Sequence, residues 1–404
     1  MKPDEKRIVA LTGCSHALSH GYLLIFAAVL SLLQKEFSMG YLGVGIMGTV
    51  MTLAYGLGAL PGGMIYNRLG ARRLYLFCFL GSAAACLLVA AAPNFILFTV
   101  GLALLGALGS VYHPLANSLI TQKVGEYGRA LGIHGAAGNA GLAATPLLAG
   151  LIASSFGWRQ AYVCFAFLGV ALSIWSLFID MSVGKEKTKS PQLVPETKSR
   201  NGSFLIFFSL PLILIYVTNM FNAFCFHGTI TFLPTYMAKR TSFQVFSLDS
   251  VAIGGMLSGI ALSLGIVGQY MGGILGQRAR LERNILLIAL LAFPFMVTMS
   301  FTMNILLLAA ALVYFFFNFC LQPMCNVLLA RHTTPEMRGT AFGIFFFVSS
   351  AIGSGAASFS GYIAQTFGLQ WVFLGISGVV VLLIVFSLLL WRTEKTRSTL
   401  TQDG

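Results

Sequence analysis

The sequence has few charged residues for its length. Asp, Glu, Lys and Arg together make up 9% of the 404 residues, whereas apolar types make up 57%. A soluble globular domain carries about 25% charged residues. A chain of this length with so few charges needs lipid as its main solvent. The composition therefore excludes a disordered chain, a secreted disulfide scaffold and an ordinary cytosolic enzyme.

The sequence also lacks the motifs of soluble chemistry. It contains no CxxC pair, and the seven cysteines lie inside apolar runs, where they are typical of small buried side chains. It has no GxxxxGK[ST] nucleotide loop, no GxSxG elbow and no HExxH. We therefore expect no cofactor, no resident metal and no catalytic residue, so the chain is not expected to be an enzyme.

Long apolar runs fill most of the chain. A helix needs roughly 20 apolar residues to cross the bilayer, and twelve runs of about that length are present. The first run is predicted to be a retained span, because it is too long for a signal peptide. The predicted spans are 8–33, 41–66, 74–92, 95–121, 130–154, 159–181, 204–238, 250–276, 284–301, 304–330, 339–365 and 370–391.

The chain divides into two similar halves. Residues 182–203 are polar and hold two prolines, which predicts a cytoplasmic linker between bundles at 1–181 and 204–404. Pro114 and Asn117 recur as Pro323 and Asn326, and further ordered matches recur at offsets of 209 to 211 residues. The fold class is therefore an all-α membrane protein with twelve transmembrane helices in two pseudo-symmetric six-helix bundles. Such repeats place a substrate site between the bundles.

The basic residues predict the orientation. The net charge is +13, but Lys and Arg fall in short connections, which argues for membrane topology and against a nucleic-acid partner. With the N-terminus inside, 21 of the 25 Lys and Arg lie on the inner side and only Lys35, Arg159, Lys239 and Arg240 on the outer side. The positive-inside rule then places both termini in the cytoplasm.

At this point the chain resembles the major facilitator superfamily over essentially its whole length. The segment 63–73 is similar to the family's loop between helices 2 and 3, although Asn67 stands where the family carries an acid. The resemblance implies the major facilitator fold and a conformational-gating loop, and the basic cluster is expected to face anionic lipid headgroups. The gating-loop residues are Gly63, Asn67, Arg68, Gly70, Arg72 and Arg73.

A narrower resemblance covers helices 4 and 5. Tyr112-His113-Pro114, Gly128-Arg129-Ala130, Gly138-Asn139 and Thr145-Pro146 are similar to the fosmidomycin-resistance group of efflux proteins. That resemblance implies export of a small molecule.

Histidines and amides are the polar residues of the spans. The twelve carboxylates lie in connections or tails, apart from Asp180 at a span end, so no carboxylate is available as an intramembrane proton relay. Five of the six histidines lie within spans. The resemblance implies that helices 1, 4, 7 and 10 line the central cavity, and most of these polar residues lie on those helices. The candidate substrate-binding or proton-coupling residues are His16, His20, His113, Asn117, His134, Asn139, Asn219, Asn222, His227, Asn318, Gln322 and Asn326.

Imidazole suits a proton-coupled anion site. It titrates near pH 6.5, so a cluster from helices 1, 4 and 5 can attract an anion when protonated and release it when neutral. The first alternative is interhelical hydrogen bonding, which would make the histidines of the spans, His134 foremost, and the amides of 318–326 structural. The second is a transition-metal site. The latter is disfavoured because no carboxylate or CxxC lies nearby.

These observations favour a secondary active transporter that works by alternating access. We expect proton-coupled efflux of a small anionic compound or drug by a monomer in the bacterial inner membrane, with protons and the lipid bilayer as its other partners. Uptake or exchange of an organic anion such as a carboxylate is the alternative. A receptor on a carrier scaffold is a second alternative, which the short tails and linker disfavour.

Overall fold

The computed structural model is a helical membrane protein. It describes residues 1–182, 207–244, 247–278, 280–333 and 335–400, without the side chains of 59–68, 127–128, 335–340, 351 and 394–400. Within these ranges no strand occurs, and twelve helical segments are long and apolar enough to cross a membrane. The helices are α1 (Pro3–Glu36), α2 (Tyr41–Leu69), α3 (Ala71–Ala91), α4 (Phe95–Gly109), α5 (Tyr112–Lys123), α6 (Tyr127–Phe156), α7 (Trp158–Leu177), α8 (Leu210–Arg240), α9 (Ser250–Gly276), α10 (Leu281–Phe301), α11 (Asn304–Arg331), α12 (Pro335–Gly353), α13 (Gly355–Thr366) and α14 (Leu369–Leu400).

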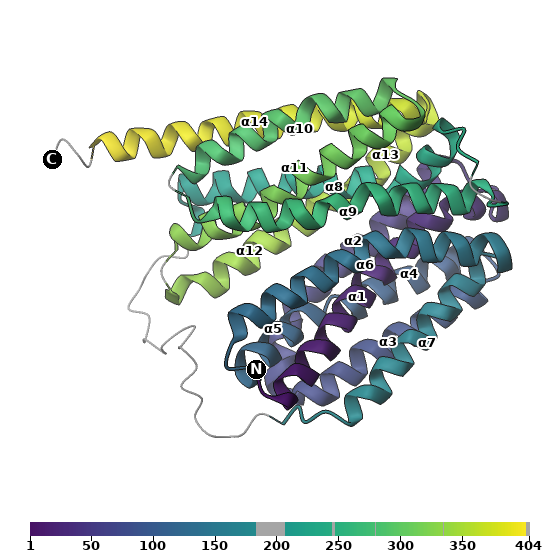
Figure 1. The fold of residues 1–404 in the computed structure, drawn as a ribbon, viewed down its shortest axis with the longest axis horizontal. Helices are drawn as coiled ribbons and strands as arrows, with labels where there is room; N and C mark the ends of the chain where they lie inside the picture. The colour runs from purple at the N-terminus through teal and green to yellow at the C-terminus, as the bar shows by residue number, and fades with distance from the viewer. Residues whose placement is uncertain (183–206, 245–246, 279, 334, 401–404) are drawn as a thin grey trace.

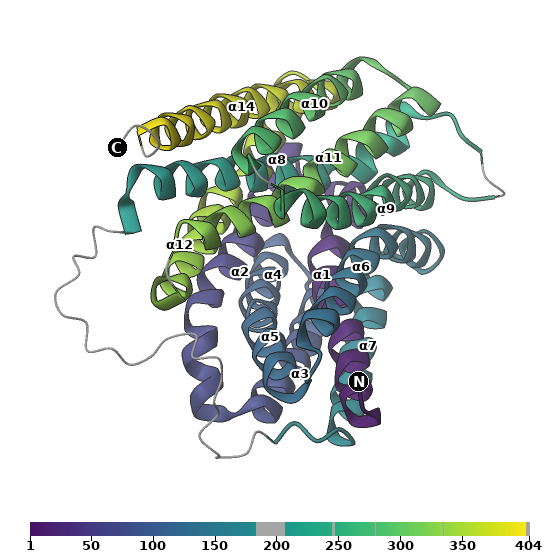
Figure 2. The same cartoon turned by 60° about the vertical axis from the view of Figure 1, so that its left-hand side comes forward.

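The helices form two bundles that lie one above the other (Figures 1 and 2). Helices α1–α7 make the lower bundle in Figure 1 and α8–α14 the upper one, and the beginning of α1 and the end of α14 lie towards the same side. The bundles meet where α6 packs on α9 and where α2 packs on α12 and α13. The part of the predicted linker from residue 183 to residue 203 lies outside the described residues.

The predicted span 95–121 consists of two helices. The helix is divided into α4 and α5 at Ser110 and Val111. Pro114 has no N–H to donate to the Ser110 carbonyl, and its ring crowds that carbonyl. The regular backbone hydrogen bonding of the helix is therefore interrupted there. The span itself remains, since residues 95–123 together cross the membrane.

The predicted helix 339–365 is also divided, and the cause lies in the other bundle. Thr49 on α2 donates its hydroxyl to the Ser354 carbonyl at 2.8 Å and accepts the Ser358 N–H at 3.1 Å. Those two groups would otherwise bond to each other in a continuous helix. The Thr49 hydroxyl therefore replaces a backbone hydrogen bond of the helix and separates α12 from α13.

The two bundles touch at the end opposite the N-terminus, which we call the closed end. The first turns of α2 lie there, because α1 runs away from the N-terminus and α2 begins after it. A Cβ on Gly361 would collide with the carbonyl of Tyr41, and one on Gly255 with the carbonyl of Pro146. Glycines thus let the helices of opposite bundles approach to backbone contact.

Thr49→Val is expected to weaken the closed end. The valine has the same shape but leaves the Ser354 carbonyl and the Ser358 N–H without the hydroxyl, which costs about 1–3 kcal/mol for buried groups. Spin labels at the exposed Ser38 and Ser242, with the exposed native Cys14 and Cys164 replaced by serine, measure the separation of the bundles there. The variant should shift the distance distribution towards longer values.

Thr52→Val is the matched control for this substitution. The Thr52 hydroxyl donates to the Gly48 carbonyl of its own helix at 2.9 Å and does not connect the bundles. The Thr52→Val variant should leave the distances between the spin labels at Ser38 and Ser242 unchanged. Equal distributions for the wild type and Thr49→Val would contradict the role of the inserted hydroxyl.

Candidate functional site

Four imidazoles gather in the first bundle. The ring centroids of His16 and His134 lie 4.1 Å apart and nearly parallel, and His20 and His113 lie 4.8 and 4.9 Å from His16. The histidines come from α1, α5 and α6, as the spacing and span assignments predicted for a cluster. His16 and His134 are buried, whereas His20 and His113 are half-buried. We call these four residues the histidine cluster.

A backbone carbonyl fixes the ring of His16. Its Nδ1 lies 2.7 Å from the carbonyl oxygen of His134, so Nδ1 carries the proton and donates it. The Nε2 atom is then an acceptor, and it is buried without a hydrogen-bond partner among the described residues. The two ring nitrogens of His134 are buried in the same way. The cluster therefore contains unused hydrogen-bonding capacity in a place where such capacity is costly.

Small residues of α6 make room for the cluster. A Cβ on Gly138 would fall within clash distance of the His16 ring, and one on Gly141 would meet the backbone of Ala17. A Cβ added to Gly132 or Gly135, on the same helix, would meet no neighbouring atom within 4 Å. Of these four glycines, only Gly138 and Gly141 lie where a side chain would collide with a neighbouring helix.

Hydroxyl groups next to the histidine cluster form hydrogen bonds that hold its helices to their neighbours. Tyr112 donates its hydroxyl to the carbonyl of Thr12, and its ring centroid lies 5.9 Å from that of His16. Ser15 and Tyr75 share a hydrogen bond of 2.5 Å. These supporting residues were not among the predicted site residues, although the position of Tyr112 next to His113 in the sequence could have indicated Tyr112.

The amides of the second bundle bond to one another and to a serine. Asn318 on α11 donates to Asn222 on α8 at 2.9 Å, and Asn219 on α8 donates to Ser349 on α12 at 2.5 Å. All four side chains are buried. This geometry matches interhelical hydrogen bonding, which was the alternative to substrate binding for Asn318.

The other predicted residues lie apart from these pairs. Asn117 and Gln322 are exposed, Asn139 is buried and Asn326 is half-buried with an unbonded Oδ1 atom. His227 on α8 is half-buried, and its ring lies 5.4 Å from that of Phe226 between centroids. Helix α8 packs on α1, the helix that carries His16 and His20.

The predicted gating loop is described only in part. Gly70 caps α3 with φ +75°, a conformation that favours glycine, as the tight turn required. Arg72 donates to the carbonyls of Leu177 at 3.0 Å and Ile179 at 2.8 Å. The pattern predicted lipid headgroups for Arg72 and did not predict this protein partner. Arg73 is exposed, and the side chains of Asn67 and Arg68, like the surroundings of Gly63, lie outside the described residues.

Carboxylates are engaged away from the histidine cluster. Glu36 pairs with Arg159 at 2.8 Å, and Asp180 pairs with Lys123 at 2.8 Å. The Lys123 ammonium, together with the hydroxyl and N–H of Ser182, holds the pKa of Asp180 well below its usual range. These acids therefore carry fixed negative charge near the ends of helices, away from the histidine cluster.

The histidine cluster could also hold a transition metal. One ring nitrogen each from His16, His20 and His113 all lie within 4.8 Å of one another. A tetrahedral zinc site with bonds of about 2.0–2.1 Å needs nitrogens about 3.4 Å apart. The rings would have to close in to reach that geometry.

The comparisons with known proteins identify the family. A sequence profile described as Major Facilitator Superfamily matches residues 10–358. The chain therefore belongs to this superfamily of membrane transporters.

Individual relatives agree with this assignment. The chain is 26% identical over 351 residues to the multidrug resistance protein MdtG of Salmonella dublin, covering 83% of this chain and 81% of that protein. It is 22% identical over 355 residues to a probable sulfoacetate transporter, SauU, of Cupriavidus necator, covering 80% of each. The fold matches a bacterial homologue of the human lysosomal transporter Spinster, crystallised inward-facing and unoccupied, with a TM-score of 0.81, 16% identity and coverage of 97% and 98% of the two chains.

The class of the protein follows from these findings. It is a multi-pass membrane protein and a secondary transporter of small molecules, and it is not an enzyme.

Gly138→Ala should disturb the histidine cluster. The added methyl group would push on the His16 ring, and overpacking of this kind costs about 1–3 kcal/mol. Thermal unfolding of the purified protein should show a lower midpoint than the wild type. The control is Gly135→Ala, which adds the same methyl to open space. If both variants unfold at the same midpoint temperature, the contact between Gly138 and His16 does not constrain the cluster.

Proposed function

We propose that this transporter exports a small organic anion and that the histidine cluster couples the movement of protons to the cargo. The observation that carries the proposal is the convergence of four imidazoles from three helices, with centroids 4.1 to 5.5 Å apart along the pairs that link them. No carboxylate of the described residues pairs with any of them. A proton taken up here gives a net positive site, which attracts an anion.

Part of the histidine cluster lies on a helix that packs against the second bundle. His20 is half-buried on α1, which packs on α8 of the second bundle, the helix that carries His227. A positive charge on His20 therefore acts on both bundles, and an anion between them would reduce the repulsion. Binding of proton and cargo together would favour states in which the bundles close around the site.

The names of the relatives support the cargo and the direction. MdtG is a multidrug resistance protein, which favours export. Sulfoacetate carries sulfonate and carboxylate groups, so the SauU match favours an anionic cargo. The same match supports the second candidate function, uptake or exchange of an organic anion. The resemblance of 112–146 to fosmidomycin-resistance proteins is a further argument for export.

The charge distribution supports a membrane location and an orientation for the protein. The distribution of 21 basic residues on one side and 4 on the other favours cytoplasmic termini in a bacterial inner membrane. The two-bundle design needs one chain for one transport path, so we propose a monomer.

Replacement of the histidines should uncouple protons from cargo. In proteoliposomes with a pH-sensitive dye inside, sulfoacetate or another small anion added to the wild type should move protons. His20→Gln and His113→Gln should reduce this proton flux by about tenfold, which corresponds to about 1.4 kcal/mol. His332→Gln, in a loop by position, is the control with unchanged flux.

Two outcomes separate the parts of the proposal. Anion flux that persists without any change in its pH dependence in the His16, His20 and His113 variants would refute the histidine mechanism and keep the transporter assignment. Proton flux that no anion elicits in the wild type would refute an anionic cargo.

Deletion of the gene should reveal the direction of transport. If the protein exports its cargo, the deletion strain should be more sensitive to at least one antibiotic in a growth screen, because the compound accumulates inside. Restoring the wild-type chain should restore resistance. Loss of growth on a single organic acid, without sensitisation, would instead establish uptake.

A further inference from the structure

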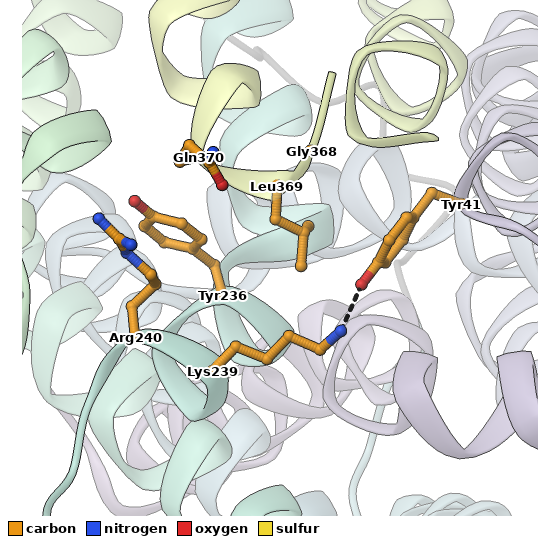
Figure 3. A pocket seen from close by; sticks show the side chains of 7 residues that line it. All are labelled: Tyr41, Tyr236, Lys239, Arg240, Gly368, Leu369 and Gln370. Atoms are coloured by element: carbon orange, nitrogen blue, oxygen red, sulfur yellow. Dashed lines mark hydrogen bonds between the residues drawn. The ribbon is translucent and has the colours of Figure 1, made fainter. Parts of the chain in front are cut away.

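A small pocket lies at the closed end, between the two bundles (Figure 3). It has a volume of about 280 Å³, and its lining contains two cations and no carboxylate. The pocket is lined by Tyr41, Tyr236, Lys239, Arg240, Gly368, Leu369 and Gln370. Tyr41 begins α2 in the first bundle, and the other residues belong to the second bundle.

A hydrogen bond crosses between the bundles in this pocket. The Lys239 ammonium donates to the Tyr41 hydroxyl oxygen at 2.8 Å, and Nζ lies 5.5 Å from the centroid of the Tyr41 ring (Figure 3). The ammonium has two further N–H donors, and the Tyr41 hydroxyl still has its own proton to donate. Both partners therefore offer donors at one point, and no ion pair among the described residues gives either of them an anionic acceptor.

The surroundings leave this positive charge uncompensated. The connections at this end hold four cations, Lys35, Arg159, Lys239 and Arg240, and two carboxylates, Glu36 and Asp249. Glu36 pairs with Arg159, and Asp249 caps α9 by accepting from Val251 N and Ala252 N. Neither carboxylate is available to Lys239 or Arg240.

We propose that this pocket binds a small oxyanion, such as a sulfate, phosphate, sulfonate or carboxylate group. The anion accepts hydrogen bonds from Lys239 Nζ and the Tyr41 hydroxyl together, with Arg240 adding positive charge to the wall. Charge-assisted bonds of this kind are short and strong. The apolar side of Leu369 and the buried ring of Tyr236 limit the space to a small headgroup.

Binding there would favour the closed end. Lys239 and Tyr41 belong to opposite bundles and lie together only while the bundles touch, so an anion that bonds to both binds this state more tightly. The site is separate from the histidine cluster and does not depend on the nature of the cargo.

Titration calorimetry with sulfate tests the site. The full-length protein in phosphatidylcholine nanodiscs should bind sulfate against a chloride background. Lys239→Gln should weaken binding at least about tenfold, and Tyr41→Phe, which keeps the ring and removes the hydroxyl, about threefold or more. Lys35→Gln removes the same charge from the same end outside the pocket and should bind like the wild type.

Spin labels at Ser38 and Ser242 provide the second measurement. Sulfate should shift the distance distribution of the wild type towards the shorter, closed population and should leave Tyr41→Phe unchanged. Sulfate binding that Lys239→Gln does not alter, or that shifts the distances equally in Tyr41→Phe, would overturn the proposal.

Nanodiscs that also contain phosphatidylglycerol distinguish the source of the anion. If a lipid phosphate occupies the pocket, sulfate affinity should fall in these nanodiscs and the Lys239 dependence should remain. If a free anion is the ligand, the affinity should be the same in both lipid compositions. Absence of sulfate binding in both compositions would overturn the site.

Discussion

The absence of water from the membrane interior is the constraint on which this structure depends. A polar group carried into lipid must find its partner inside the protein, because an unbonded group there costs several kcal/mol. Amides of the second bundle meet this requirement directly, as Asn318 bonds to Asn222 and Asn219 to Ser349. Each bundle also holds buried polar atoms without such a partner among the described residues, for example His16 Nε2 in the first bundle and Asn326 Oδ1 in the second.

The same constraint ties the contact between the bundles to the helix backbone. Thr49 inserts its hydroxyl between the Ser354 carbonyl and the Ser358 N–H, so the closed end is held by groups that a continuous helix would use internally. In a continuous helix the Ser354 carbonyl and the Ser358 N–H would bond to each other. The same two groups therefore serve the contact between the bundles here in place of a bond within one helix.

Close backbone contact accompanies these hydrogen bonds. The glycines at 255 and 361 face carbonyls of the opposite bundle, so the two backbones approach there without a side chain between them. Gly138 and Gly141 act differently, within one bundle, where they let α6 lie against α1 and leave space for the His16 ring. A glycine-rich sequence therefore serves two purposes, which are close contact between the bundles and fixed geometry within the histidine cluster.

The sequence by itself determined the membrane class, the spans and the repeat, because lipid imposes a length and an apolar composition on every crossing helix. It also determined that the histidines of 16, 20, 113 and 134 belong to spans that can meet, since the i,i+4 spacing and the span order are local properties. Only the tertiary structure decided which polar groups pair. The bonds of Asn318 to Asn222 and of Lys239 to Tyr41 join residues 96 and 198 positions apart, and the break at Ser354 has its cause on α2. Such contacts depend on how two bundles pack together, and no local pattern of residues encodes that distance.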